Sequence, residues 1–149
     1  MDALDRKILV CLKENARANA TEIGSKINLS TSAVIERIRK MEAAGLIRQY
    51  TVVLSPQPDR EQIAYIYVRL DHPKYYEGFV DAVNFHEAIA ECYYIAGDFD
   101  FILKVVSMKG MTLERVLNDI KSIPGVCLTR TNVVLSTNKR EICILPPED

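Results

Sequence analysis

The chain has few residues of the kinds that build metal sites, disulfide frameworks or membrane spans. Its cysteines, Cys11, Cys92, Cys127 and Cys143, lie far apart among apolar neighbours without a C-x-x-C pair, and it has only two histidines. Buried, reduced thiols are therefore expected, and neither a metal nor another cofactor. No apolar run approaches the ~18 residues that a membrane span requires. The N-terminus opens directly on a helix rather than on a targeting segment, so we expect a cytoplasmic protein.

The chain also lacks a strong net charge, although its two parts differ. The formal net charge is −1, but residues 1–60 carry 10 Lys and Arg against 7 Asp and Glu, whereas residues 61–149 carry 9 against 13. A length of 149 residues, 48% of them hydrophobic, is enough for two units with real cores. The basic excess lies in the first part, where attraction to phosphate is expected. The excess is modest, so affinity should depend on several copies acting together.

The N-terminal third shows three amphipathic segments separated by short turns. Asp2 can cap a first helix, and Asn19 followed by Glu22 has the spacing of a capping box for a second, short helix. Asn28 stands where a turn needs a residue that tolerates positive φ, and Leu29 can fill the angle between two helices. Three helices with a short turn before the third predict a helix-turn-helix module.

The third segment is apolar on one side and polar to basic on the other. Val34, Ile38 and Met41 recur on one stripe, and Ser30 can cap the helix. Hydroxyls at the helix N-terminus suit phosphates, while longer side chains on the same side can reach base edges. The residues expected to meet DNA are Ser30, Thr31, Ser32, Glu36, Arg37, Arg39 and Lys40.

Two alternatives stay open for this helix. Glu36 can accept a hydrogen bond from cytosine N4, or it can pair with Lys40 four residues on, and we favour the ion pair. The module can also be a small helical bundle whose third helix merely has a solvated basic face. After the helices, residues 47–54 are rich in β-forming side chains and predict the strand of a wing.

The second half predicts an alternating set of strands and helices beyond a proline-containing linker at 55–60. Apolar periodicity indicates strands at 63–70, 89–96, 101–106, 126–136 and 141–145, with helices around 76–83 and 113–123. With right-handed crossovers, this β-α-β-β-α-β order gives an antiparallel sheet with two helices on one face. The domains expected are 1–54 and 61–149. The fold class is therefore α+β, a winged helix-turn-helix joined to a ferredoxin-like domain.

One face of the predicted sheet is left without helices. It bears Tyr65, Tyr67 and Tyr93, and a half-covered sheet with aromatic side chains on its open side is typical of an association surface. We interpret the second half as the assembly domain. The alternative is a monomer whose tyrosines are simply exposed.

Six motifs in order resemble the Lrp/AsnC family of prokaryotic transcriptional regulators, the feast/famine regulators. They are the Asp2…Asp5…Ile8-Leu9 start, the Leu29-Ser30 turn, residues 36–42, Gly45-Leu46-Ile47 with Tyr50, the run 97–104, and Pro124-Gly125-Val126 followed by Thr129-Arg130-Thr131. The resemblance extends along the whole chain. It implies a winged helix-turn-helix, a ferredoxin-like regulatory domain, homodimers formed through the sheets and often assembled into octamers, and amino acids as effectors bound between dimers.

The family's effector loop falls on residues 97–100. A zwitterionic amino acid needs an acceptor for its ammonium group, which Asp98 and Asp100 can supply, and donors for its carboxylate, which backbone N–H groups around Ala96 and Gly97 can supply. Hydroxyls can be added from a neighbouring strand, giving the expected effector site Ala96, Gly97, Asp98, Asp100, Thr129 and Thr131. The same G-D-x-D pattern is also an ordinary hairpin turn.

The function predicted is a transcriptional regulator that binds double-stranded DNA sequence-specifically and responds to a small effector, expected to be an amino acid. The alternative is an architectural DNA-binding protein of the same fold without an effector. An enzyme is not expected, because the only candidate groups are the paired aspartates and a cysteine with no evident histidine partner.

Overall fold

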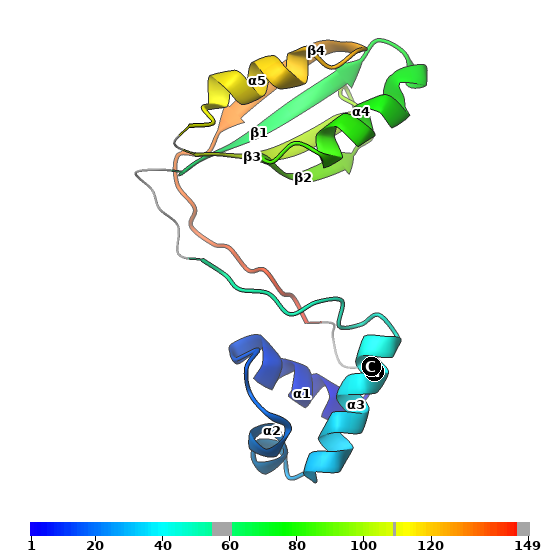
Figure 1. Ribbon diagram of the computed structural model, residues 1–149, viewed down its shortest axis with the longest axis vertical. Coiled ribbons are helices and arrows are strands. Elements are labelled where there is room, and N and C mark those ends of the chain that lie inside the picture. The colour runs from blue at the N-terminus through cyan, green and yellow to red at the C-terminus, as the bar shows by residue number, and fades with distance from the viewer. Residues whose placement is uncertain (55–60, 109, 146–149) are drawn as a thin grey trace. The chain divides into compact units, whose positions relative to one another are not determined.

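The computed structural model describes residues 1–54, 61–108 and 110–145, which fall into two units (Figure 1). The first unit contains residues 1–54 together with 139–145, and the second contains residues 61–138. The predicted linker, 55–60, lies outside the described residues. The second domain was expected to continue to the C-terminus, but its last described segment groups with the helical unit instead. There Lys13 Nζ pairs with a carboxylate oxygen of Glu141 at 2.5 Å.

The first unit is built from three helices, α1 (Ala3–Glu14), α2 (Ala20–Ile27) and α3 (Thr31–Ala43). Both predicted caps are confirmed, because Asp2 and Asn19 each form a complete capping box with the residue three positions on. These bonds satisfy backbone N–H groups that the first turn of a helix leaves unpaired. The apolar stripes meet in one core, made of Ile8, Cys11, Ile23, Val34 and Met41.

The strand predicted for a wing is not formed, and neither is the short final strand. Residues 48–54 and 141–145 have no regular secondary structure, and Val52 and Ile144 are 81% and 83% exposed. Both segments are rich in β-forming residues, but a strand exists only where a neighbour accepts and donates its ladder hydrogen bonds. Within the described parts of one chain, neither segment has such a neighbour.

The second unit is a four-stranded sheet in the order β2-β3-β1-β4, with every neighbouring pair antiparallel. Its strands are β1 (Glu61–Leu70), β2 (Ile89–Tyr94), β3 (Phe101–Met108) and β4 (Val126–Val133). A short 3-10 turn, η1 (Pro73–Tyr75), leads into α4 (Tyr76–Asn84), and α5 (Leu113–Lys121) connects β3 to β4. The predicted ferredoxin-like order is therefore confirmed, although β4 ends three residues earlier than expected.

Both helices of this unit cover the same face of the sheet (Figure 1). Phe79 of α4 packs on Phe101 of β3 with ring centroids 4.6 Å apart, and α5 contributes Val116 and Ile120 to the same core. Along β3, fully buried side chains alternate with half-buried ones, as a sheet covered on one side requires. The alternation predicted from the sequence is therefore the pattern that packs α4 and α5 onto the sheet.

The other sheet face carries no helix and is lined by the predicted tyrosines. Tyr65 and Tyr67 of β1 lie opposite Lys104 and Ile102 of β3, and Tyr93 of β2 is 53% exposed. The face also holds a polar cluster, in which Glu91 accepts hydrogen bonds from Lys104 Nζ at 2.6 Å and from the hydroxyl of Tyr93 at 2.9 Å. We call this surface, lined by Tyr65, Tyr67, Tyr93, Ile102 and Lys104, the open sheet face.

The four cysteines are free, as expected, but they are not all buried. Cys11 lies in the helical core and Cys92 is half-buried, where burial raises the pKa of its thiol. Cys127 and Cys143 are exposed, which corrects the expectation of four buried thiols. Cys127 sits on an edge strand, where apolar neighbours in the sequence do not guarantee cover in the fold.

Candidate functional site

The turn between α2 and α3 is fixed by its backbone. Asn28 has the predicted left-handed conformation, with φ 58°, and its N–H donates to the carbonyl of Gly24. The N–H of Leu29 donates to the same carbonyl at 2.9 Å, and the Leu29 side chain packs against the helical core. A Cβ added at Gly24 would lie 2.5 Å from the Leu29 carbonyl oxygen, so a side chain there would push the two helices apart.

The N-terminus of α3 presents the predicted hydroxyls to solvent. Ser30 caps the helix, its Oγ accepting from the N–H of Ala33 at 3.2 Å and lying 3.2 Å from Ser32 Oγ. Thr31 Oγ1 lies 3.3 Å from Thr21 Oγ1 on α2. Ser30, Thr31 and Ser32 are all exposed, so a helix N-terminus with three hydroxyls is open to an anion such as a phosphate.

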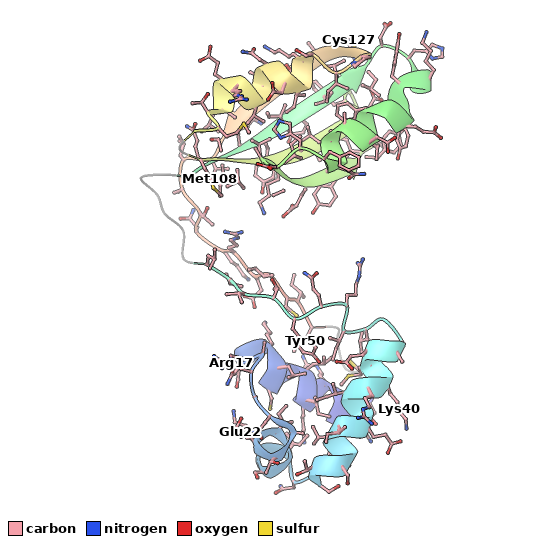
Figure 2. The ribbon with its side chains drawn as sticks, viewed as in Figure 1. Arg17, Glu22, Lys40, Tyr50, Met108 and Cys127 are labelled. Carbon is pink, nitrogen blue, oxygen red and sulfur yellow. The ribbon has the colours of Figure 1, made fainter. Side chains whose placement is uncertain are left out.

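The two sides of α3 differ as predicted. Val34 and Met41 are buried against α1 and α2, whereas Ser32, Glu36 and Arg39 are exposed. Glu36 forms the favoured ion pair, with 2.7 Å between its carboxylate and Lys40 Nζ, and this bond holds the pKa of the Glu36 carboxyl below its usual value. Lys40 lies on the surface of α3 with its side chain 73% exposed (Figure 2).

Arg37, which the sequence predicted to meet DNA, is held by carboxylates of its own chain, so its contact with DNA stays a prediction. Its Nη1 is bound by Asp2 Oδ2 at 2.6 Å and by Asp5 Oδ1 at 2.7 Å, and 29% of its side chain is exposed. The N–H of Asp5 and the Arg37 guanidinium lower the pKa of Asp2, and the two carboxylates raise the pKa of Arg37. The guanidinium therefore joins α3 to the capping box of α1. We call these three residues the Arg37 clamp.

Arg39 is the exposed cation of α3 whose charge is not neutralised by a described carboxylate. Among the residues that the structure describes, no ion pair or hydrogen bond holds its side chain, whereas Arg37 and Lys40 are both paired with carboxylates. A guanidinium without a protein partner keeps its full capacity to bind a phosphate or a guanine edge.

Tyr50 holds the segment that follows α3 against the end of that helix. Its hydroxyl donates to Glu42 at 2.9 Å, and partial burial together with this bond raises the pKa of Tyr50 to about 12. This hydrogen bond holds the segment after α3 close to the end of the helix, although the segment forms no wing strand.

The expected effector loop is the β2–β3 hairpin. It is closed by a hydrogen bond of 2.8 Å from the N–H of Ile95 to the carbonyl of Asp100, and Ala96, Gly97 and Asp98 are exposed at its tip. Gly97 has φ 143°, which only glycine adopts without strain. The tip therefore offers accessible backbone and one carboxylate.

The other residues of this loop are used by the fold. Asp100 accepts a hydrogen bond from the N–H of Leu70 at 2.7 Å, so its carboxylate anchors the hairpin to the end of β1. Phe99 is buried on the open sheet face, 5.6 Å from the ring of Tyr67 and beneath the guanidinium of Arg130. Asp98 is thus the loop carboxylate that no described contact occupies, whereas one oxygen of Asp100 already accepts from the backbone. The predicted contact of the two aspartates with an effector stays a prediction.

The two threonines are placed apart from the loop tip. Thr129 and Thr131 lie opposite Val68 and Ile66, so their side chains share the face that the helices cover. Both are half-buried, and within the described residues no hydrogen bond joins either of them to the hairpin. Their predicted contact with an effector stays a prediction.

Metal sites and membrane-spanning helices are both missing from the described parts of the chain. Residues 1–54, 61–108 and 110–145 contain no group of three His, Cys, Asp or Glu side chains arranged to hold a metal ion. Within those ranges every helix is too short or too polar to cross a bilayer.

Comparison with known proteins identifies both units. The AsnC-type helix-turn-helix domain matches residues 1–42, and the Lrp/AsnC ligand binding domain matches residues 63–142. The chain belongs to the Lrp/AsnC family of transcriptional regulators. This membership makes it a regulator rather than an enzyme, and the helix-turn-helix makes DNA its partner.

Individual members of the Lrp/AsnC family match nearly the whole chain. The transcriptional regulator FL11 of Pyrococcus abyssi is 34% identical over 140 residues, 93% of this chain and 92% of the relative. The leucine-responsive regulatory protein of Escherichia coli K12 is 33% identical over 144 residues, 94% and 88% of the two chains. A crystal structure of a Neisseria meningitidis transcriptional regulator in complex with L-methionine superposes with a TM-score of 0.88 and 28% identity, covering 97% and 96%.

The division of roles on α3 can be tested with two arginine variants. We expect Arg39→Ala to weaken binding to duplex DNA and to reduce the slope of log K against log salt by about 0.9 for each phosphate that Arg39 neutralises. Arg37→Met should leave that slope unchanged and lower the thermal stability of the helical unit, because it breaks the Arg37 clamp. Fluorescence anisotropy across a salt series measures the slopes. A reduced slope for Arg37→Met would show that Arg37 also contacts DNA, as the sequence predicted.

Proposed function

We propose that this Lrp/AsnC regulator reads DNA sequence-specifically through α3, and that two copies place their α3 helices in successive major grooves. The proposal is carried by the outward side of α3, where exposed hydroxyls and Arg39, which no described contact holds, lie opposite the buried stripe. Two such helices reach grooves about 34 Å apart on a roughly palindromic site. Because it acts on DNA, we expect the protein to work in the cytoplasm.

A second copy would associate through the open sheet face. Tyr65, Tyr67 and Ile102 are only half-buried there and Tyr93 is 53% exposed, and a partly exposed aromatic and apolar surface of this kind favours association. We propose a homodimer built on this face, with dimers assembling further to an octamer as the family resemblance implies. Assembly would supply the several reader helices that a modest positive charge requires.

We further propose that an amino acid binds at the tip of the β2–β3 hairpin. The Neisseria relative was solved with L-methionine, and the hairpin of this chain offers groups that suit both charged ends of an amino acid. Asp98 would accept from the ammonium group, and backbone N–H groups near Ala96 and Gly97 would donate to the carboxylate. Binding would change how dimers associate, and therefore how many reader helices meet the DNA.

The experiment is a thermal-shift panel of the full chain with the twenty amino acids, followed by light scattering with each amino acid that shifts the melting. A ligand at ~100 times its dissociation constant adds ~2.7 kcal/mol if it binds only the folded state. We expect at least one amino acid to raise the melting temperature and to change the assembled mass. Flat melting curves across the panel would favour an architectural protein without an effector.

A further inference from the structure

Ile35 is an apolar side chain on the outward side of α3. It is 38% exposed, and it lies outside the helical core that takes Val34, Met41 and Ile38. Single exposed apolar residues are common on protein surfaces and by themselves mean little. What distinguishes Ile35 is its place on the helix that presents the hydroxyls and the Arg39 guanidinium, which no described residue binds.

Helical spacing puts Ile35 in the middle of that group. Ser32 precedes it by three residues and Arg39 follows it by four, so the three side chains form one stripe along the helix. The neighbouring flank of α3 is different, because Arg37 and Lys40 are held there by three carboxylates. The cations of that flank are therefore already neutralised, and the stripe of Ser32, Ile35 and Arg39 is the side that best suits a groove of DNA.

The edges of bases in the major groove carry one apolar group, the 5-methyl of thymine, and apolar side chains recognise it by contact. The hydrogen-bonding groups on either side of Ile35 can bind phosphates or purine edges. The isoleucine side chain has no such group, so it can contribute to binding only by contact with an apolar group of the DNA. We propose that Ile35 determines specificity by packing against a thymine 5-methyl group. This inference rests on the proposed reading of DNA by α3.

The test pairs a side-chain change with the removal of one methyl group from the DNA. Duplexes are selected from a random library with the wild-type chain, and each invariant thymine is then replaced by deoxyuridine. We expect at least one replacement to weaken wild-type binding about fourfold, or about 0.8 kcal/mol, the value of one buried methyl group. Ile35→Ala should bind the thymine and deoxyuridine duplexes equally.

Leu46→Ala is the matched control, because Leu46 is a 42% exposed apolar residue beyond the end of α3 and off the stripe. It should keep the fourfold discrimination, and circular dichroism melts should show both variants folded. A discrimination that survives in Ile35→Ala, or selected sites without an invariant thymine, would overturn the role of Ile35 while leaving α3 as the reader. A selection that enriches no sequence would overturn the proposed sequence-specific function, and the role of Ile35 with it.

Discussion

Replacing Gly24 by alanine should destabilise the helical unit by about 2 kcal/mol, while the same replacement at Gly78 should stabilise the sheet unit by about 0.5–1 kcal/mol. Both glycines lie inside helices, where alanine is normally the better residue. A Cβ at Gly78 meets nothing within 4 Å, but a Cβ at Gly24 meets the Leu29 carbonyl oxygen at 2.5 Å. The same glycine-to-alanine substitution is therefore expected to lower the free energy of unfolding at one position and to raise it at the other.

The Leu29 carbonyl has little freedom to move away. Its own residue donates a hydrogen bond to Gly24, and the preceding residue is held in the left-handed conformation. Hydrogen exchange along a urea series reports each unit separately, because the two glycines belong to different units. DNA binding by the Gly24 variant should fail at temperatures where the helical unit unfolds. A neutral or stabilising effect of Gly24→Ala would show that the turn can relax, and that close packing does not define the helix-turn-helix here.

The turn and the caps could be predicted because their causes are local. A capping box joins residues three apart, and a left-handed Asn28 follows from the residue type at one position. Sheet alternation is equally local, which is why the β-α-β-β-α-β order of the second unit and the helix-covered face were predicted correctly. Ion pairing between Glu36 and Lys40 belongs to the same class, since it joins residues four apart on one helix.

The contacts that the sequence does not reveal are those whose partner is far away along the chain. Arg37 lies at the edge of the buried stripe, and its charge suggested DNA, but the carboxylates that bind it come from the first turn of α1, more than thirty residues earlier. Asp100 was assigned to a ligand although the amide of Leu70, thirty residues earlier, occupies it. Residues 47–54 were assigned a strand from composition alone, and composition does not supply the neighbouring strand. Ile35 gives no signal of its own in the sequence, because an apolar residue beside a buried stripe is normally counted with the core.

A pair of hairpin variants should separate ligand binding from folding in this regulator. Asp98→Ala is expected to weaken amino-acid binding by about 10–100-fold, because a hydrogen bond to a charged group contributes about 1.5–3 kcal/mol. The melting temperature without ligand should stay unchanged, since Asp98 is exposed and no described contact holds it. Asp100→Ala should instead lower the stability of the sheet unit by about 1–3 kcal/mol, because the N–H of Leu70 is then left without its acceptor.

Calorimetric titration with L-methionine, and with every amino acid that stabilises the wild-type chain, measures the affinities, while thermal melts measure the stabilities. The two aspartates stand two residues apart on one hairpin, so a general disturbance of the loop would affect both properties in both variants. If Asp98→Ala reduces only the affinity and Asp100→Ala reduces only the stability, then Asp98 contacts the ligand and Asp100 holds the backbone. Unchanged affinity in Asp98→Ala would remove its carboxylate from the proposed site and leave the backbone amides of the hairpin, with the predicted hydroxyls of Thr129 and Thr131, to bind an effector. Ligand recognition would then rest on its carboxylate rather than its ammonium group, and other carboxylic acids should bind as tightly as amino acids do.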